Sequence, residues 1–197
     1  DEGMYPSGSA HGMVVEANPE FASKGIILLD AERAQAKLAT EPSAKVIAEL
    51  SEGRKIIYGF TGGTIRGIHF GEDDGQAGAP KAADILNPEA VDEFIRLTHD
   101  RYYEELKEYF GNTVIAFFTD EPSALGRNAG HYRDWVAGLE EEILASGGKV
   151  EELEALFIRR GHVAGRADIV ETAENKTVLI YRQLIKKKLR EIFYARL

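Results

Sequence analysis

A run of apolar residues, 114–118, leads directly into the tetrapeptide Thr119-Asp120-Glu121-Pro122. A short apolar run bounded by turn residues is typical of a buried parallel strand. Proline has a fixed φ and no N–H group, so Pro122 ends the strand and holds the residue before it in a defined place. The order therefore predicts a carboxylate pair, Asp120 and Glu121, at the exit of a buried strand. The alternative is an ordinary turn, because Asp and Pro are both common turn residues.

The segment before this run predicts a helix over 88–110. Asn87 is a favourable N-cap, Pro88 suits the first helical position, and apolar residues recur at helical spacing as far as Phe110. Gly111 supplies a C-terminal stop. A helix, a glycine turn and an apolar strand form half of a right-handed βαβ unit. This order therefore predicts an α/β fold with its chemistry at the carboxyl ends of parallel strands.

Shorter patterns predict the remaining elements. A short helix over 10–23 is interrupted by Pro19, and residues 31–52, which show no strong periodicity, are interpreted as helical or irregular. We predict strands over 25–30, 54–60 and 64–70, a loop over 71–83, helices over 132–146 and from 149, and a long amphipathic helix capped by Thr172.

Composition limits the class of partner. The chain has 197 residues, enough for one domain with a sizeable core. Its net charge of −9 argues against nucleic-acid and anionic-membrane partners. It has no cysteine, which excludes disulfides and thiol catalysis, and no apolar run approaches the length of a membrane span. Because the chain opens in turn residues and ends in a helical pattern, we expect a segment of a longer protein.

Three stretches, 5–20, 83–103 and 110–122, together resemble the catalytic (β/α)8 barrel of large bacterial glycoside hydrolases related to α-L-rhamnosidase-type enzymes. The resemblance covers most of residues 1–135 and is weak over 31–53, where such proteins often carry an insertion. It implies an α/β fold, a partial (β/α)8 TIM-barrel segment with a helical C-terminal portion. Residues 1–125 would hold strands two to four, and 126–197 would be a helical continuation of the barrel domain.

The resemblance also implies catalytic roles. Asp120-Glu121-Pro122 resembles the Asn-Glu-Pro that ends strand four in the large retaining clan, where the Glu is the general acid/base. Asp120 replaces the Asn that contacts the sugar 2-hydroxyl, which leaves an inverting mechanism open. Glycoside hydrolysis needs a second carboxylate, and in the retaining clan it comes from strand seven, beyond this chain. Within the chain the candidates are Asp1, Glu2, Glu72, Asp73 and Asp74.

Polar and aromatic side chains at the expected barrel mouth are candidate sugar contacts, with turn or core roles as their alternatives. Calcium binding by the acidic run 72–74 is an alternative to a solvated or sugar-contacting loop, and we expect no cofactor. Trp135 and Tyr132 form either a sugar-stacking platform or part of a core. The candidate substrate-binding residues are Tyr5, Ser9, His11, Arg66, His69 and Asp74.

The leading hypothesis is a glycoside hydrolase fragment that is inactive alone because its second carboxylate lies outside the chain. The alternatives are a non-catalytic carbohydrate-binding module and a structural domain. We expect a carbohydrate substrate, a bacterial cytoplasmic rather than secreted location, and self-association through open sheet edges.

Overall fold

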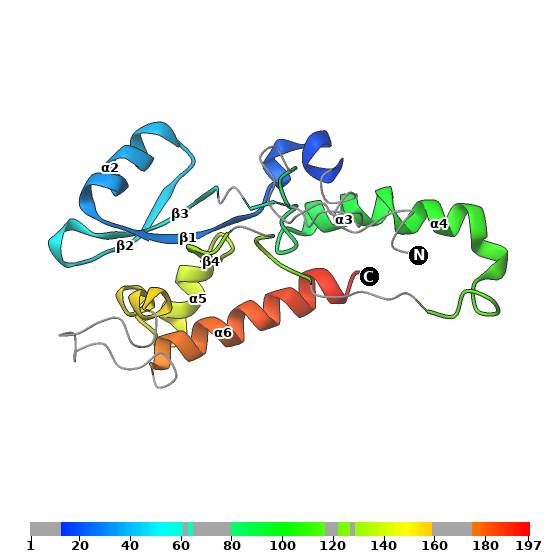
Figure 1. Ribbon diagram of the computed structural model, residues 1–197. Coiled ribbons are helices and arrows are strands. Elements are labelled where there is room, and N and C mark those ends of the chain that lie inside the picture. The colour runs from blue at the N-terminus through cyan, green and yellow to red at the C-terminus, as the bar shows by residue number, and fades with distance from the viewer. Residues whose placement is uncertain (1–12, 61–62, 65–79, 117–121, 127–128, 159–174) are drawn as a thin grey trace. The chain divides into compact units, whose positions relative to one another are not determined.

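The structure is a computed structural model that describes residues 13–60, 63–64, 80–116, 122–126, 129–158 and 175–197 (Figure 1). The chain divides into two compact units. Unit 1 holds the described residues of Asp1–Ser23, Gly62–Ala129 and Glu191–Leu197, and unit 2 holds those of Lys24–Thr61 and Gly130–Arg190. Each unit is therefore assembled from segments that are distant in sequence.

Unit 2 is built on a four-stranded sheet in the order β2-β3-β1-β4. Strand β1 pairs with both β3 and β4, and β2 pairs with β3, with an irregularity between Val46 and Ala48. All three pairings are antiparallel. The strands are β1 (Lys24–Leu29), β2 (Lys45–Glu49), β3 (Lys55–Phe60) and β4 (Tyr132–Asp134).

This sheet contradicts the predicted fold class. A partial (β/α)8 TIM-barrel segment would place β1 and β3 in parallel, and a complete barrel needs eight parallel strands. The strands at 25–30 and 54–60 were predicted close to their observed bounds, but their direction was wrong. Both faces of this sheet are covered by helices, so its central strands carry the continuous apolar runs that usually indicate a parallel sheet.

One face of the sheet is covered by helix α2 (Ala31–Thr40), as Figure 1 shows. The helix begins at Ala31 because the side chain of Asp30 accepts a hydrogen bond of 2.8 Å from the N–H of Arg33. A Cβ atom on Gly59 of β3 would lie 3.3 Å from Cε of Lys37, so α2 approaches the strand closely at this glycine.

The opposite face packs on α5 (Leu139–Ala145), the 3₁₀ segment η4 (Val150–Phe157) and α6 (Lys176–Leu189). Ile26 of β1 and Ile56 of β3 are completely buried there against Trp135. This is the main core of unit 2, formed by side chains that alternate along the strands. Its other fully buried members are Leu139, Ile143 and Leu153.

The helical C-terminal prediction is correct in part. Residues 132–146, predicted as one helix, form strand β4 and then α5. The predicted cap Thr172 lies outside the described residues, and Asn175 caps α6 by accepting a bond of 3.1 Å from the N–H of Val178. Helix α6 continues into a π-helical turn at Arg190–Tyr194.

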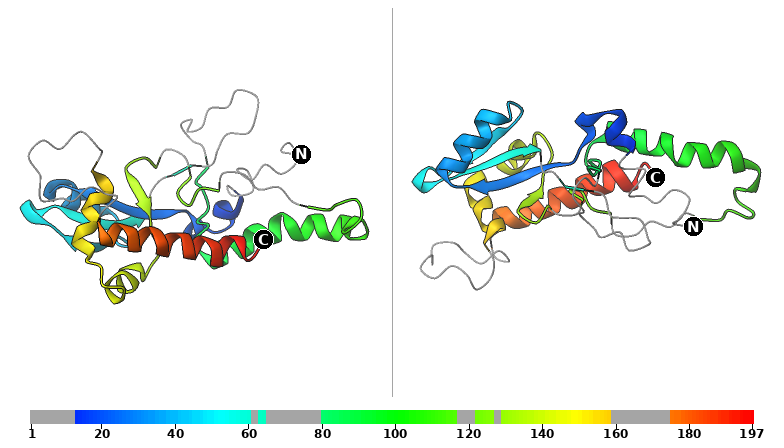
Figure 2. Two further views of the ribbon diagram at one scale, coloured as in Figure 1. Left: turned by 90° about the horizontal axis from the view of Figure 1, so that it is seen from below. Right: turned by 45° about the horizontal axis from the view of Figure 1, so that its top comes forward.

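In unit 1 the predicted helix 88–110 is present but interrupted. Helix α3 (Pro88–Leu97) begins after the predicted cap Asn87, and α4 (His99–Leu106) follows it along nearly the same line (Figure 2). The break falls at Thr98, whose hydroxyl donates to the carbonyl of Phe94 at 2.7 Å and competes with the backbone ladder. A 3₁₀ turn, η3 (Lys107–Tyr109), leads to Gly111 at φ +83°.

The apolar run at 114–118 does not form the predicted strand over its described residues. The N–H of Val114 donates to the carbonyl of Tyr109 at 2.9 Å, and the N–H of Gly111 donates to Val114 at 3.0 Å. These bonds close a tight turn, which uses the backbone groups that a strand would present to a neighbour. Ile115 is 82% exposed, so the run is not buried at this point.

The N-terminal part of unit 1 follows its prediction more closely. Residues 13–17 are helical, and a 3₁₀ turn, η1 (Pro19–Phe21), follows them. Asn18 separates the two by accepting a bond of 3.1 Å from the N–H of Glu20. The break predicted at Pro19 therefore exists, with proline at the first position of the new turn.

Candidate functional site

The predicted site residues lie outside the described part of the chain, and their roles stay predictions. This applies to the carboxylate pair, to the sugar-contacting candidates and to the acidic run considered for calcium. The residues concerned are Asp120, Glu121, Tyr5, Ser9, His11, Arg66, His69, Glu72, Asp73 and Asp74.

The described residues that follow the carboxylate pair are anchored by a buried hydrogen bond. The hydroxyl of Ser23 donates to the backbone carbonyl of Leu125 at 3.0 Å, across 102 positions of sequence. Ser23 is 1% exposed and Leu125 is 6% exposed, so water does not compete for this carbonyl. The bond ties the end of the N-terminal segment to the backbone four residues after Glu121.

Gly126, the residue after Leu125, lies in a space that has no room for a side chain. Its φ of +74° lies in the left-handed region that glycine adopts without strain. A Cβ atom there would lie 2.4 Å from Cβ of Ala82 and 2.5 Å from the carbonyl oxygen of Thr64. The two neighbouring atoms are a backbone oxygen and a Cβ attached directly to backbone, so neither can move aside. Position 126 therefore has no room for a side chain.

Short backbone pairings join the same segments to one another. The N–H of Ser23 donates to the carbonyl of Ala82 at 2.8 Å, and the N–H of Ala82 donates to Gly63 at 3.1 Å. The N–H of Asp84 donates to the carbonyl of Phe21 at 2.8 Å. We call this set of residues, 21–23, 63–64, 81–84 and 125–126, the junction of unit 1.

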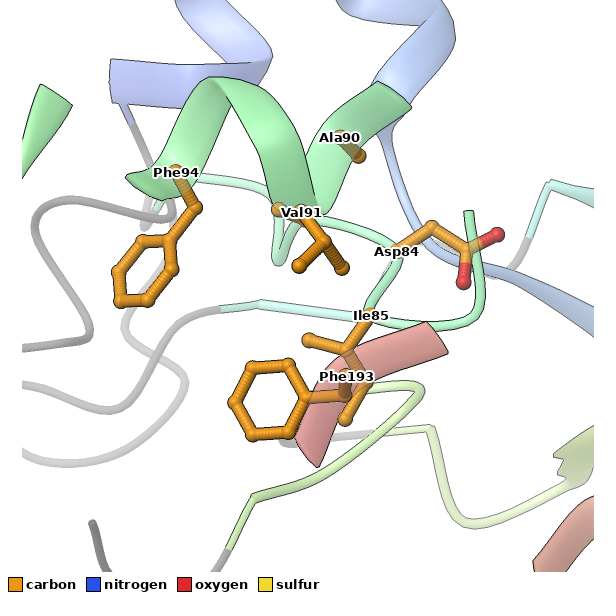
Figure 3. A pocket seen from close by; sticks show the side chains of 7 residues that line it. Asp84, Ile85, Ala90, Val91, Phe94 and Phe193 are labelled. Atoms are coloured by element: carbon orange, nitrogen blue, oxygen red, sulfur yellow. The ribbon is translucent and has the colours of Figure 1, made fainter. Parts of the chain in front are cut away.

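A shallow apolar depression lies beside the junction, with about 170 Å³ of empty space that includes open solvent. Figure 3 shows Val91 and Phe94 of α3 above it and Ile85 and Phe193 below. The lining residues are Ala83, Asp84, Ile85, Ala90, Val91, Phe94 and Phe193.

The depression lacks the polar groups that orient a sugar. Asp84 is its one charged lining residue, and its carboxylate accepts a bond of 2.9 Å from the N–H of Leu86. That bond shapes the turn into α3. Ligand sites combine apolar walls with several converging polar groups, so we assign no binding role to this depression.

His99, within the second resembling stretch, is held in one tautomer. The Thr98 hydroxyl donates its single hydrogen to the carbonyl of Phe94, so the contact of 2.8 Å between Thr98 Oγ1 and His99 Nδ1 requires the ring to donate. The ring also meets Phe94 edge to face, with centroids 5.5 Å apart. Partial burial lowers the pKa of His99, which favours the neutral ring at pH 7.

We expect unit 1 to lose stability as the pH falls below the ordinary histidine value of about 6.5. Because the pKa of His99 is lowered in the folded state, the unfolded chain binds the proton first, and acid therefore favours unfolding. Hydrogen exchange of peptides from α3 and α4, measured in urea at pH 7.5 and 5.5, tests this. His99→Gln should reduce the difference in the free energy of unfolding between the two pH values. An equal difference in that variant would exclude His99 as the source of the pH dependence.

Trp135 belongs to the core of unit 2 and not to an exposed sugar platform. Its side chain is completely buried and lies nearly parallel to the ring of Tyr181, at 18° and 6.3 Å between centroids. Tyr132, the other candidate for the platform, is half-buried in β4. Of the two alternatives given for Trp135, the core role is correct.

Burial is the largest cause of the pKa shift in two ionisable groups of unit 2, and the nearby Arg133 charge opposes it in both. Desolvation raises the pKa of Asp134 and, more strongly, that of the Tyr181 hydroxyl. This hydroxyl donates to the backbone carbonyl of Asp134 at 2.7 Å, so it links α6 to β4. The link is structural, and no second carboxylate accompanies Asp134 among the contacts described for it.

Sequence reasoning missed the residues of the junction. Ser23 lies in a segment without a motif, and its partner Leu125 is 102 positions away. Gly126 follows a leucine in a stretch without a predicted helix or strand before 132, and a lone glycine there is too common to indicate a close contact. His99 lies within a resembling stretch but had not been considered as a functional side chain.

Among the described residues, no group of three or more histidine, aspartate and glutamate side chains is arranged to hold a metal ion. In the same part of the chain, no helix combines the length and the apolar character needed to cross a membrane.

Comparison with known proteins adds no relative. No protein-family model matches the chain, and no curated protein or solved structure is significantly similar to it.

Proposed function

We propose that this chain carries part of the active site of a glycoside hydrolase, with Glu121 as the general acid/base and Asp120 as a neighbouring substrate contact. The proposal rests on residue types. Cleavage of a glycosidic bond requires a proton donor for the leaving oxygen and a second carboxylate that acts as nucleophile or base. The sequence Asp120-Glu121-Pro122 offers a carboxylic acid of this kind, followed by a rigid proline.

The observation that carries the proposal is the division of the chain into units. The described parts of the three resembling stretches, 13–20, 83–103 and 110–116 with Pro122, all belong to unit 1. The segment of weak resemblance, 31–53, belongs to unit 2. Segments that pack into one body can bring their side chains into one site, and an insertion can form a body of its own.

The junction supports the same interpretation. It joins the residues that directly follow the first stretch, 21–23, to those around the start of the second, 81–84, and to those that follow the third, 125–126. Catalytic side chains depend on loops that a rigid scaffold positions. The proposal therefore places the catalytic machinery in unit 1 and gives unit 2 no catalytic residue.

The test is hydrolysis of a panel of aryl glycosides by the product of the complete natural reading frame that encodes this chain. We expect release of the phenol by the wild-type protein. On unsubstituted phenyl glycosides, whose leaving group needs a proton, Glu121→Gln should lose about 10²-fold or more in kcat, because the amide cannot donate it. Asp92→Asn, a carboxylate exchange on the exposed side of α3, is the matched control and should retain activity.

Two outcomes would contradict the proposal. One is the absence of turnover on every glycoside tested, and the other is full activity in Glu121→Gln. Sugar binding without turnover would instead favour a carbohydrate-binding module.

A further inference from the structure

We infer that the exposed side of α6 binds an acidic peptide segment of a partner protein. Arg182, Lys186, Lys187 and Arg190 are all exposed on this side, and we call them the basic face. The basic face lies within unit 2, to which the proposed function assigns no catalytic residue. Failure of either proposal therefore leaves the other standing.

Cations are concentrated on this helix in a chain that is acidic as a whole. The chain has 24 lysine and arginine residues and a net charge of −9, and residues 176–190 contain no aspartate or glutamate. Lys188 is the least exposed cation for which an ion pair is described on the helix, and it is neutralised by Glu142 of α5 within unit 2. The basic face is instead presented to solvent. The cations of this segment are Lys176, Arg182, Lys186, Lys187, Lys188 and Arg190.

Three cations of the basic face form a row along the helix. Arg182, Lys186 and Arg190 are four residues apart, so each lies about 6 Å from the next along the axis. The helix is regular to the end of the row, because the N–H of Arg190 donates to the carbonyl of Lys186. Alternate residues of an extended peptide recur at about 6–7 Å. An extended segment with carboxylates at alternate positions therefore matches the row.

Folding of the helix does not account for this row. Like charges four residues apart on a helix repel each other and destabilise it. The helix dipole favours cations near the C-terminus but acts only within the last turn, and Arg182 lies two turns before Arg190. A bound anionic partner relieves the repulsion along the whole row and is attracted by it.

Other anionic partners fit the molecule less well. Nucleic acid is a long polyanion, and the net charge of −9 repels whatever part of it extends beyond the row. An amphipathic helix binds a membrane by its apolar face, and the apolar side of α6 is buried in unit 2 with Val178 and Tyr181. A short acidic segment needs only the row itself.

The test is the fluorescence anisotropy of a labelled peptide of alternating glutamate and serine, titrated with the full-length protein. We expect saturable binding at an ionic strength of about 0.01 M, where charges act over about 30 Å. Binding should weaken strongly at about 0.15 M, where this range falls to about 8 Å. The same peptide with glutamine in place of glutamate should not bind.

Removal of the row gives the decisive variant. Arg182→Gln, Lys186→Gln and Arg190→Gln in combination should weaken binding about 10-fold, because three exposed ion pairs are lost and each contributes modestly. Lys186→Arg, which keeps the charge, should bind as wild type. Both variants should keep the urea midpoint of the wild type within error, since exposed substitutions of this kind have small effects on stability.

The matched control has the same change in net charge. It removes three exposed cations from other elements and should bind the peptide nearly as well as wild type. Its substitutions are Arg33→Gln, Lys107→Gln and Lys149→Gln.

Three results would overturn the inference. The first is no binding of the glutamate peptide at the lower ionic strength, and the second is an equal loss in the two triple variants. The third is tighter binding, dependent on the same row, of a thymidine oligonucleotide of equal length or of vesicles that contain phosphatidylserine.

Discussion

Trp135→Ala is expected to unfold unit 2 or leave it barely stable. The indole is completely buried among Ile26, Ile56 and Tyr181, so its removal opens a large cavity in the main core of the unit. Substitutions of this kind cost about 3–5 kcal/mol, and a domain of ordinary stability has only about 5–15 kcal/mol in total. Urea unfolding followed by far-UV circular dichroism should show the midpoint falling sharply.

Trp135→Phe is the matched control for that experiment. It keeps an aromatic ring next to Tyr181 and removes an indole N–H that is buried without a hydrogen-bond partner among the described residues. Its cost should therefore be clearly smaller than that of the alanine variant. A free energy of unfolding for Trp135→Ala within about 1 kcal/mol of wild type would contradict the packing of this core, since effects that small occur mainly at surface positions.

Gly126→Ala is expected to disrupt unit 1 to a similar degree. The added methyl group would lie 2.4 Å from Cβ of Ala82 and 2.5 Å from the carbonyl oxygen of Thr64, at a φ of +74°. Left-handed backbone costs a non-glycine residue about 1–2 kcal/mol, and overpacking adds about 1–3 kcal/mol. Hydrogen exchange of peptides from α3, recorded through a urea series, reports the loss of stability in unit 1.

Gly111→Ala separates the two contributions. Gly111 lies in the same unit at a similar φ, +83°, but nothing lies within 4 Å of the position its Cβ would take. This variant should therefore show the backbone cost alone. If the two variants lose equal stability, the close contact at the junction does not exist as described.

Local features of the fold could be predicted from the sequence because their causes are local. The start of α3 follows from Asn87 and Pro88, and the end of the helical segment follows from Gly111. Strands β1 and β3 follow from short apolar runs. The core role of Tyr181 and Val178 follows from helical spacing along α6.

Strand direction and long-range contacts could not be predicted, because they depend on partners far along the chain. Strand β2 was missed, since it is a short edge strand whose irregularity at Val46 and Ala48 removes the alternation that marks a strand. The parallel sheet was wrongly predicted from the order of the helix over 88–110, Gly111 and the apolar run, and the described residues of that run form no strand. Ser23 and Leu125 carried no local signal of their contact.

The proposed role of Glu121 is tested most directly by the effect of the leaving group in Glu121→Gln. A general acid assists a poor leaving group strongly and a good one weakly, because only the former needs a proton as the bond breaks. The measurement compares kcat/KM of wild-type and variant full-length protein on two glycosides of the same sugar, one with a dinitrophenol and one with a simple alcohol as leaving group. Our account predicts a small loss for the dinitrophenyl glycoside and a loss of about 10²-fold or more for the alkyl glycoside. Equal losses on both substrates would contradict it.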